Sequence, residues 1–135
     1  FGAMKEQVLL EIQKRNLKDR VIIASDDHSA CDLYNAFDLF VLPSTSEGLG
    51  IVAIEAQANG LNVLASCNVP QEANILGKVR FVDLNLNEWE NNLCDSNFYK
   101  RSIVNLESFS KTGYEIKSAA DSRGLDYLNM VERHE

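Results

Sequence analysis

The sequence has few residues of the kinds that mark membrane, disordered or disulfide-linked proteins. Its 135 residues include two prolines and three cysteines, and 45% of them are apolar. This composition argues against disorder, and no apolar run approaches the roughly 20 residues that a membrane-spanning helix needs. The N-terminal residues lack the basic and then apolar segments that mark secretion. We therefore expect a soluble, cytoplasmic chain that forms one domain or part of one.

The cysteines Cys31, Cys67 and Cys94 are an odd set without the spacing of metal ligands. Such a set favours free thiols in a reducing compartment over a disulfide framework, and we expect these thiols to be buried or half-buried. His28 follows two aspartates and could hold a metal or act as a base, but a lone loop histidine is more typical of a solvated side chain. His134 lies in a charged tail and carries no signal. The sequence thus predicts no metal site and no cofactor.

Basic residues are absent from a long interval of the chain. The formal net charge is −7, and no Lys or Arg occurs between Arg20 and Lys78. Because nucleic-acid binding needs a basic face, this charge argues against a nucleic-acid partner. An anion bound within this interval must be held by backbone N–H groups or by cationic side chains from elsewhere.

Hydrophobic periodicity predicts an alternation of helices and strands. Helical spacing or capping signals predict helices over residues 4–16, 29–37, 50–59, 70–75, 97–109 and 114–132. Short apolar runs predict strands over residues 20–25, 38–42, 61–66 and 79–83. No helix or strand is predicted for the segment from Asn87 that contains Trp89 and Leu93. The expected fold class is α/β, a Rossmann-like parallel sheet with flanking helices, which binds ligands beyond the carboxyl ends of its strands. Since such domains normally open with a strand, we also expect at least one strand–helix unit upstream.

One segment combines a strand end, a glycine-containing loop and a helix start. It follows the run Leu39–Leu42 and reads Pro43-Ser-Thr-Ser-Glu47-Gly-Leu-Gly50-Ile-Val-Ala-Ile-Glu55-Ala-Gln57-Ala. The unpaired N–H groups of a helix start favour an anion, whereas ionised carboxylates accept hydrogen bonds from hydroxyl groups. A sugar nucleotide carries both kinds of group.

The two glutamates of this segment also have purely structural interpretations. The helix that follows Gly50 is apolar almost all round, which predicts that it is buried and that the carboxylate of Glu55 needs a partner. That partner could be a neighbouring loop's N–H groups, Arg20 or Lys78. Glu47 could simply complement the positive end of the helix dipole.

The same residues resemble the signature of the family 4 glycosyltransferases of GT-B fold. The resemblance lies in Pro43-Ser44, Glu47-Gly-Leu-Gly50, a second glutamate eight positions after the first, and Gly60-Leu-Asn-Val-Leu-Ala-Ser66. Within that family, the sequence is most similar to bacterial capsular and exopolysaccharide glycosyltransferases. This similarity lies in the pattern Glu55-Ala-Gln57-Ala with Asn68-Val-Pro70 and Glu72-Ala. The resemblance covers nearly the whole chain. It implies one partial, N-terminally truncated donor-binding domain over residues 1–135, the C-terminal half of a GT-B fold, with a C-terminal helix over about 110–135.

The resemblance also implies a role for each matching residue. Glu55 would accept hydrogen bonds from the ribose hydroxyls of the donor, and Glu47 would act as the catalytic-site group beside the transferred sugar. Backbone amides would face the pyrophosphate and sugar at Gly48, Leu49, Gly50, Ile51 and Val52. The loop at Ser25, Asp26 and Asp27 would meet the base, although family members usually have Gly at the Ser25 position and polysaccharide-type members often have Arg at the Asp27 position.

The parent reaction implied by the resemblance transfers a hexosyl group from a UDP-sugar to a growing surface polysaccharide, with retention and without a required metal. The family's cationic pair that neutralises the diphosphate lies upstream of this chain. The acceptor, a glycan or a lipid-linked glycan, would bind through the N-terminal domain, which is also absent. We therefore expect the isolated chain to be inactive and the parent to associate peripherally with the inner face of the membrane.

Three other classes remain open. A GT-B-fold isomerase acting on a nucleotide sugar would share the fold, and a noncatalytic nucleotide-binding or scaffolding module would tolerate the missing cationic pair. A flavodoxin-like signalling domain would need a phospho-acceptor aspartate at a strand end, whereas Asp38 opens its strand. Acyl transfer and Walker-type phosphate binding are disfavoured, because Ser44 and Ser46 lack a nucleophile elbow and the chain has no Walker loop.

Overall fold

A computed structural model describes residues 4–24 and 29–114 of the chain. The chain divides into two compact units, Phe1–Ala30 and Cys31–Glu135. The prediction of a single domain over 1–135 stays a prediction. So does the helix predicted over 114–132, which lies outside the described residues except for Tyr114.

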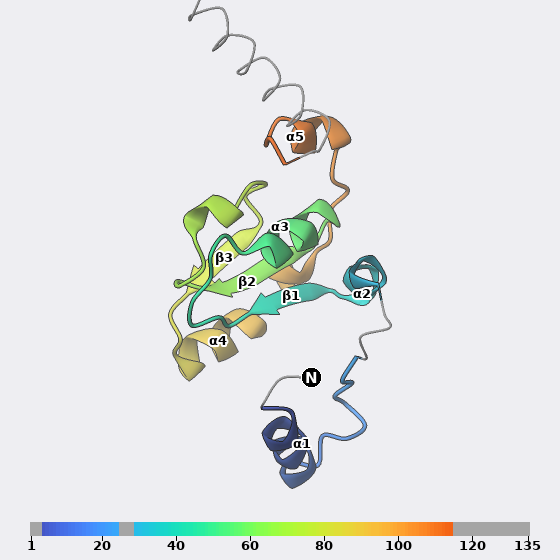
Figure 1. Ribbon diagram of the computed structural model, residues 1–135, viewed down its shortest axis with the longest axis vertical. Helices are drawn as coiled ribbons and strands as arrows, with labels where there is room; N and C mark the ends of the chain where they lie inside the picture. The colour runs from blue at the N-terminus through green and yellow to red at the C-terminus, as the bar shows by residue number, and fades with distance from the viewer. Residues whose placement is uncertain (1–3, 25–28, 115–135) are drawn as a thin grey trace, which may run out of the picture. The chain divides into compact units, whose positions relative to one another are not determined.

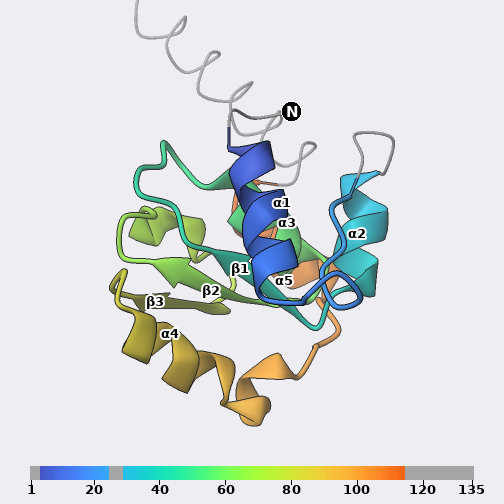
Figure 2. The same ribbon diagram turned by 90° about the horizontal axis from the view of Figure 1, so that it is seen from below.

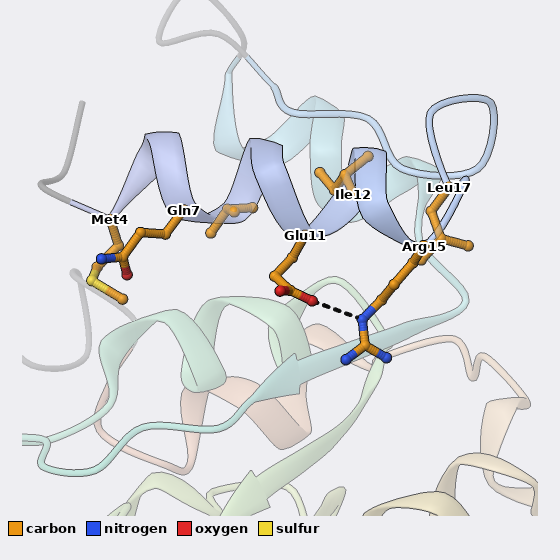
Figure 3. A pocket seen from close by; sticks show the side chains of 7 residues that line it. Met4, Gln7, Glu11, Ile12, Arg15 and Leu17 are labelled. Atoms are coloured by element: carbon orange, nitrogen blue, oxygen red, sulfur yellow. Dashed lines mark hydrogen bonds and ion pairs between the residues drawn. The ribbon is translucent and has the colours of Figure 1, made fainter.

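The first unit contains the helix α1 (Lys5–Lys14), as its helical spacing predicts. Arg15 Nε donates to Glu11 Oε2 at 3.0 Å, an i,i+4 ion pair on the surface of the helix. No residue of α1 is buried. The side chains of Met4, Gln7, Glu11, Ile12, Arg15 and Leu17 line a pocket along this helix and the turn after it (Figure 3).

The strand predicted over residues 20–25 is wrong for its described part. Residues 21–24 form no strand, and Ile22 is 94% exposed. A β-branched run becomes a strand only when a neighbouring strand pairs with its N–H and C=O groups. The described part of this unit provides no such strand.

The second unit is built on a parallel sheet, which confirms the predicted fold class (Figure 1). Its strands are β1 (Leu39–Leu42), β2 (Asn62–Ser66) and β3 (Val79–Val82), in the order β1-β2-β3. Phe40 lies opposite Val63, and Val63 lies opposite Val79. The carboxyl ends of all three strands therefore meet at one edge.

Helices lie on both faces of this sheet (Figures 1 and 2). The helix α3 (Ile51–Ala58) covers one face, and its Ala53, Ile54 and Ala56 share a buried cluster with Val63 and Ala65 of β2. The helix α4 (Leu86–Leu93) covers the other face, where Arg80 of β3 donates to Asn92 Oδ1 at 3.0 Å. Leu64 and Val82 are buried on that second face, as alternation along a strand requires.

The short helix α2 (Ala30–Ala36) lies within the predicted range 29–37 but buries an unexpected residue. Tyr34 is the buried residue of this helix, and Phe37, which follows its end, is 36% exposed. The 3₁₀ turn η1 (Gln71–Ala73) follows Pro70, inside the predicted range 70–75. Gly60 has a φ of 83°, the left-handed conformation in which glycine commonly ends a helix.

The region after β3 differs most from the sequence prediction. The helix α4 occupies the segment to which no element was assigned, and it is capped by Asn85, whose side chain accepts from Asn87 N. The helix predicted over 97–109 is wrong in its middle: only η2 (Ser96–Tyr99) and α5 (Leu106–Ser110) are helical. Between them, backbone groups bond to other elements, since Ser102 N donates to Gly60 O at 3.2 Å.

The cysteines also depart from the prediction. All three are free thiols, as expected, but Cys31, Cys67 and Cys94 are exposed rather than buried. Cys31 lies in the first turn of α2, Cys67 follows β2, and Cys94 caps the end of α4. Each therefore lies at or near the end of an element, where the side chain can reach solvent.

Candidate functional site

The loop between β1 and α3 holds Glu47 through a chain of hydroxyl groups. Ser44 Oγ donates to Glu47 Oε1 at 2.6 Å, and Ser66 Oγ donates to the carbonyl oxygen of Ser44. Ser66 is fully buried at the carboxyl end of β2. The carboxylate of Glu47 is thus fixed relative to two neighbouring strands at the edge where parallel sheets bind ligands.

The start of α3 presents unused backbone donors. Its N-cap residue, Gly50, has a φ of 75° and no side chain to cap the helix. In the described part of the chain, nothing accepts a hydrogen bond from the N–H groups of residues 48–52. These groups and the positive end of the helix dipole can receive an anion. No lysine or arginine occurs in this part of the sequence, so no cationic side chain from this segment would bind the anion as well.

Glu55 lies on α3 one turn further on, and it is exposed. The prediction that it is a buried carboxylate is wrong, because one face of α3 is uncovered: Ile51 is 61% exposed and Val52 is 38% exposed. Its hydrogen-bond partner is a residue that the sequence did not suggest. Glu55 Oε2 accepts a hydrogen bond from Tyr34 Oη at 2.9 Å, while Lys78 Nζ donates to Ser102 Oγ.

Tyr34 is the residue that the sequence analysis missed at this site. Its side chain is 5% exposed, and its hydroxyl also lies 3.4 Å from the carbonyl oxygen of Val52. Burial raises the pKa of Tyr34 to about 12, and the hydrogen bond to Glu55 adds to the rise. The phenol therefore remains a donor to the carboxylate at neutral pH. A tyrosine 21 residues upstream of Glu55 gives no local signal of this contact.

A buried amide fixes α3 against the next loop. Gln57 Nε2 donates to the carbonyl oxygens of Ala53 at 2.9 Å and Ala73 at 2.6 Å, and Leu76 N donates to Gln57 Oε1 at 3.1 Å. The side chain of Gln57 is fully buried and all of these bonds are internal. This glutamine supports the helix and does not face a ligand.

Several predicted residues cannot be placed. Ser25, Asp26, Asp27 and His28 lie outside the described residues, and so does His134. Base recognition therefore stays a prediction.

Within residues 4–24 and 29–114, no group of three or more His, Cys, Asp or Glu side chains could hold a metal ion. In the same ranges, no helix is long and apolar enough to cross a membrane.

A second pocket lies at the carboxyl edge of the sheet in the same unit. It is lined by Pro43 after β1, by Leu84 and Leu86 after β3, and by Trp89 of α4. Trp89 Nε1 donates to the carbonyl oxygen of Asp83 at 2.9 Å, so the indole ring is oriented by the turn that precedes α4. This pocket is apolar and contains none of the predicted donor-binding residues.

Comparisons with known proteins agree on one kind of enzyme. The family model described as "Glycosyl transferases group 1" matches residues 1–80. The Bacillus subtilis (strain 168) protein named "Putative glycosyltransferase EpsF" is 32% identical over 71 residues, which are 53% of this chain and 18% of that protein. The Rhizobium meliloti (strain 1021) protein named "Lipopolysaccharide core biosynthesis mannosyltransferase LpsB" is 34% identical over 64 residues, 47% of this chain and 18% of that protein. Each aligned segment thus spans less than a fifth of the relative. No solved structure matches the chain.

Proposed function

The chain belongs to the glycosyl transferases of group 1, whose family model matches residues 1–80 of its 135, and on this premise we propose that it is the donor-binding part of such an enzyme. The parent transfers a hexosyl group from a UDP-sugar to a growing surface polysaccharide, with retention of configuration. It works in the cytoplasm, at the inner face of the membrane, on a glycan or lipid-linked acceptor held by a further domain. The isolated chain binds donor but does not turn it over.

One observation carries this proposal: two carboxylates flank a row of unused N–H groups. Glu47 lies before these groups in the loop, and Glu55 lies after them on α3. An anion that accepts from the N–H groups of residues 48–52 would place a hydroxyl-bearing group within reach of each carboxylate. A nucleotide sugar has this order of groups, since its diphosphate lies between a ribose and a hexose.

The proposed mechanism rests on fixed dipoles. As the bond between the sugar and the diphosphate breaks, negative charge develops on the leaving phosphate oxygen. The N–H groups at the start of α3 are held in place by the helix, so they would stabilise this charge without reorganisation. Glu47 accepts a hydrogen bond from the transferred sugar and orients it, without acting as a base. Glu55 holds the ribose.

Glu55→Ala tests this proposal. The substitution removes the ribose acceptor from an exposed helix face, so we expect UDP to bind roughly tenfold more weakly while the fold is retained. Isothermal titration of UDP into the wild-type and variant chains measures the change. Glu90→Ala, which removes an exposed carboxylate from α4 on the other face of the sheet, is the matched control. Unchanged UDP affinity in Glu55→Ala would sink the assignment.

The two glutamates are expected to affect different steps of the reaction. In a full-length parent, Glu47→Ala should mainly lower turnover, because Glu47 contacts the transferred sugar and not the nucleotide. Glu55→Ala should mainly raise the Michaelis constant for the donor. Steady-state kinetics of both variants distinguish the roles.

A further inference from the structure

Tyr34 combines a buried ring with a hydroxyl that reaches one surface carboxylate. The ring packs edge-on against Phe40, with centroids 5.6 Å apart, and against Phe37, with centroids 6.5 Å apart. Its hydroxyl donates to Glu55 Oε2 at 2.9 Å. The position of the hydroxyl is therefore set by the core and not by a mobile surface side chain.

This contact restricts the side-chain conformation of Glu55, which could otherwise adopt several rotamers. A glutamate on an exposed helix face samples several rotamers, and a ligand that binds it must select one of them. The Tyr34 hydroxyl fixes Oε2 and thereby the plane of the carboxylate. An ionised carboxylate has about four acceptor positions, of which Tyr34 occupies one. Among the residues that the structure describes, no other group occupies the remaining positions on this exposed side chain.

We propose that Tyr34 is a positioning residue that sets the preference of this site for ribonucleotides over 2′-deoxyribonucleotides. The inference rests on the proposed function, since it takes Glu55 as the ribose acceptor. The two hydroxyls of a ribose are neighbouring donors. One carboxylate can accept a hydrogen bond from each of them when the plane of the carboxylate is fixed. When one hydroxyl is missing, a fixed carboxylate loses a hydrogen bond outright. A carboxylate free to rotate adjusts to the single hydroxyl, and the preference shrinks.

Tyr34→Phe isolates this effect. It keeps the ring and its contacts with Phe37 and Phe40 but removes the hydroxyl. The raised pKa of Tyr34 keeps that hydroxyl protonated at neutral pH, so the substitution removes a donor and no charge. Because Glu55 is exposed, its carboxylate can hydrate after the change, and the fold should persist.

The experiment titrates the ¹⁵N-labelled 135-residue chain with UDP and with 2′-deoxy-UDP, followed by amide chemical shifts. We expect the wild type to bind UDP roughly tenfold more tightly than 2′-deoxy-UDP, the effect of one hydrogen bond to a charged acceptor. In Tyr34→Phe, UDP affinity should fall about threefold to tenfold, and the preference should shrink to about twofold or less. Tyr99→Phe makes the same chemical change on η2 and should keep the wild-type preference.

Two further variants keep the test decisive. Glu55→Asp shortens the side chain by one methylene and withdraws the carboxylate from the Tyr34 hydroxyl, so it should lose the preference even if Tyr34→Phe folds poorly. In a Glu55→Ala background, Tyr34→Phe should leave UDP affinity unchanged. A further loss there would show that Tyr34 does not act through Glu55, and would overturn the inference.

The outcomes separate this inference from the proposed function. A wild-type chain that binds UDP and 2′-deoxy-UDP equally, or shows no saturable shift with UDP, contradicts Glu55 as ribose acceptor and removes the basis of both. A wild-type chain that prefers UDP, together with a Tyr34→Phe variant that keeps the same preference, overturns only the positioning role. Amide spectra and urea unfolding of each variant show whether its fold is retained.

Discussion

At the scale of single residues, the two glycines beside Glu47 have different reasons to be glycine. Gly50 has a φ of 75°, and a Cβ there would lie 3.0 Å from Val69 Cγ1. Gly48 has no atom within 4 Å of the position its Cβ would take, and its φ lies outside the left-handed range. The fold therefore requires glycine at position 50. At position 48 it leaves open space next to the unused N–H groups, which is consistent with a ligand approaching the backbone there.

We predict that the two alanine substitutions affect different properties. Gly50→Ala should lower the free energy of unfolding by about 1–3 kcal/mol, because a left-handed conformation and a tight contact both oppose a Cβ. Gly48→Ala should change it by less than about 0.5 kcal/mol, as exposed sites usually do, yet should weaken UDP binding by crowding the anion site. Urea unfolding and calorimetry measure the two quantities. Equal stability losses would contradict the distinction, and full UDP affinity in Gly48→Ala would argue against the anion site.

The sequence located the carboxylates of this site but not what holds them. Glu47 and Glu55 belong to one continuous segment, so their spacing along the chain places them on the same loop and helix. Their partners come from elsewhere: Tyr34 from α2, and Ser66, which orients Ser44, from the end of β2. Such contacts depend on tertiary packing, which local spacing does not encode.

At the scale of elements, the amino edge of the sheet is closed by η2 and the segment that follows it. Asn62 Nδ2 at the start of β2 donates to the carbonyl oxygen of Phe98 at 2.6 Å. Arg101 donates to the carbonyl oxygens of Tyr34 and Asn35 in α2, at 3.1 and 2.8 Å, and of Asn59 after α3, at 2.9 Å. One guanidinium thus joins the C-terminal ends of the two helices that carry Tyr34 and Glu55, where the helix dipoles favour a cation.

Arg101→Met should therefore destabilise the second unit by about 1–2 kcal/mol, since it removes three charge-assisted hydrogen bonds from a partly solvated site but keeps the apolar stem. UDP affinity should also fall modestly, because α2 and α3 then lose one of the contacts that hold them together and keep only those made by Tyr34. Lys100→Met, which removes a neighbouring exposed charge, is the control. Urea unfolding of both variants checks the prediction, and equal midpoints would contradict it.

Elements were predicted well where the chain supplies its own stop signals. The strand β1 ends before Pro43 and α3 ends before Gly60, and both were located to within two residues. The run Val21–Ile23 has the same apolar character as β1 but forms no strand. The helix predicted over 97–109 is interrupted because residues 98–102 bond to the amino edge of the sheet. In both failures, the deciding factor is which other segment pairs with the backbone.

At the scale of the whole molecule, the distribution of charge makes the proposed anion site unusual. The chain carries a formal charge of −7, and the interval from Val21 to Gly77, which contains the site, has no lysine or arginine. Arg80 is paired with Asp95 at 3.0 Å, and Arg101 binds the helix ends at the amino edge of the sheet. In the described part of the second unit, the site thus depends on backbone dipoles, within a protein whose net charge repels a nucleotide.

This arrangement predicts the sign of the salt dependence of UDP binding. Sites that pair phosphates with cationic side chains lose affinity as salt screens the attraction. Here salt screens a net repulsion, so raising sodium chloride from about 0.02 to about 0.2 M should leave UDP affinity unchanged or raise it by up to about twofold. Titrations at several salt concentrations measure this, and uncharged uridine controls for effects unrelated to charge. A severalfold loss of UDP affinity, absent for uridine, would mean that lysine or arginine side chains contact the diphosphate. The N–H groups of residues 48–52 would then not be its main partner.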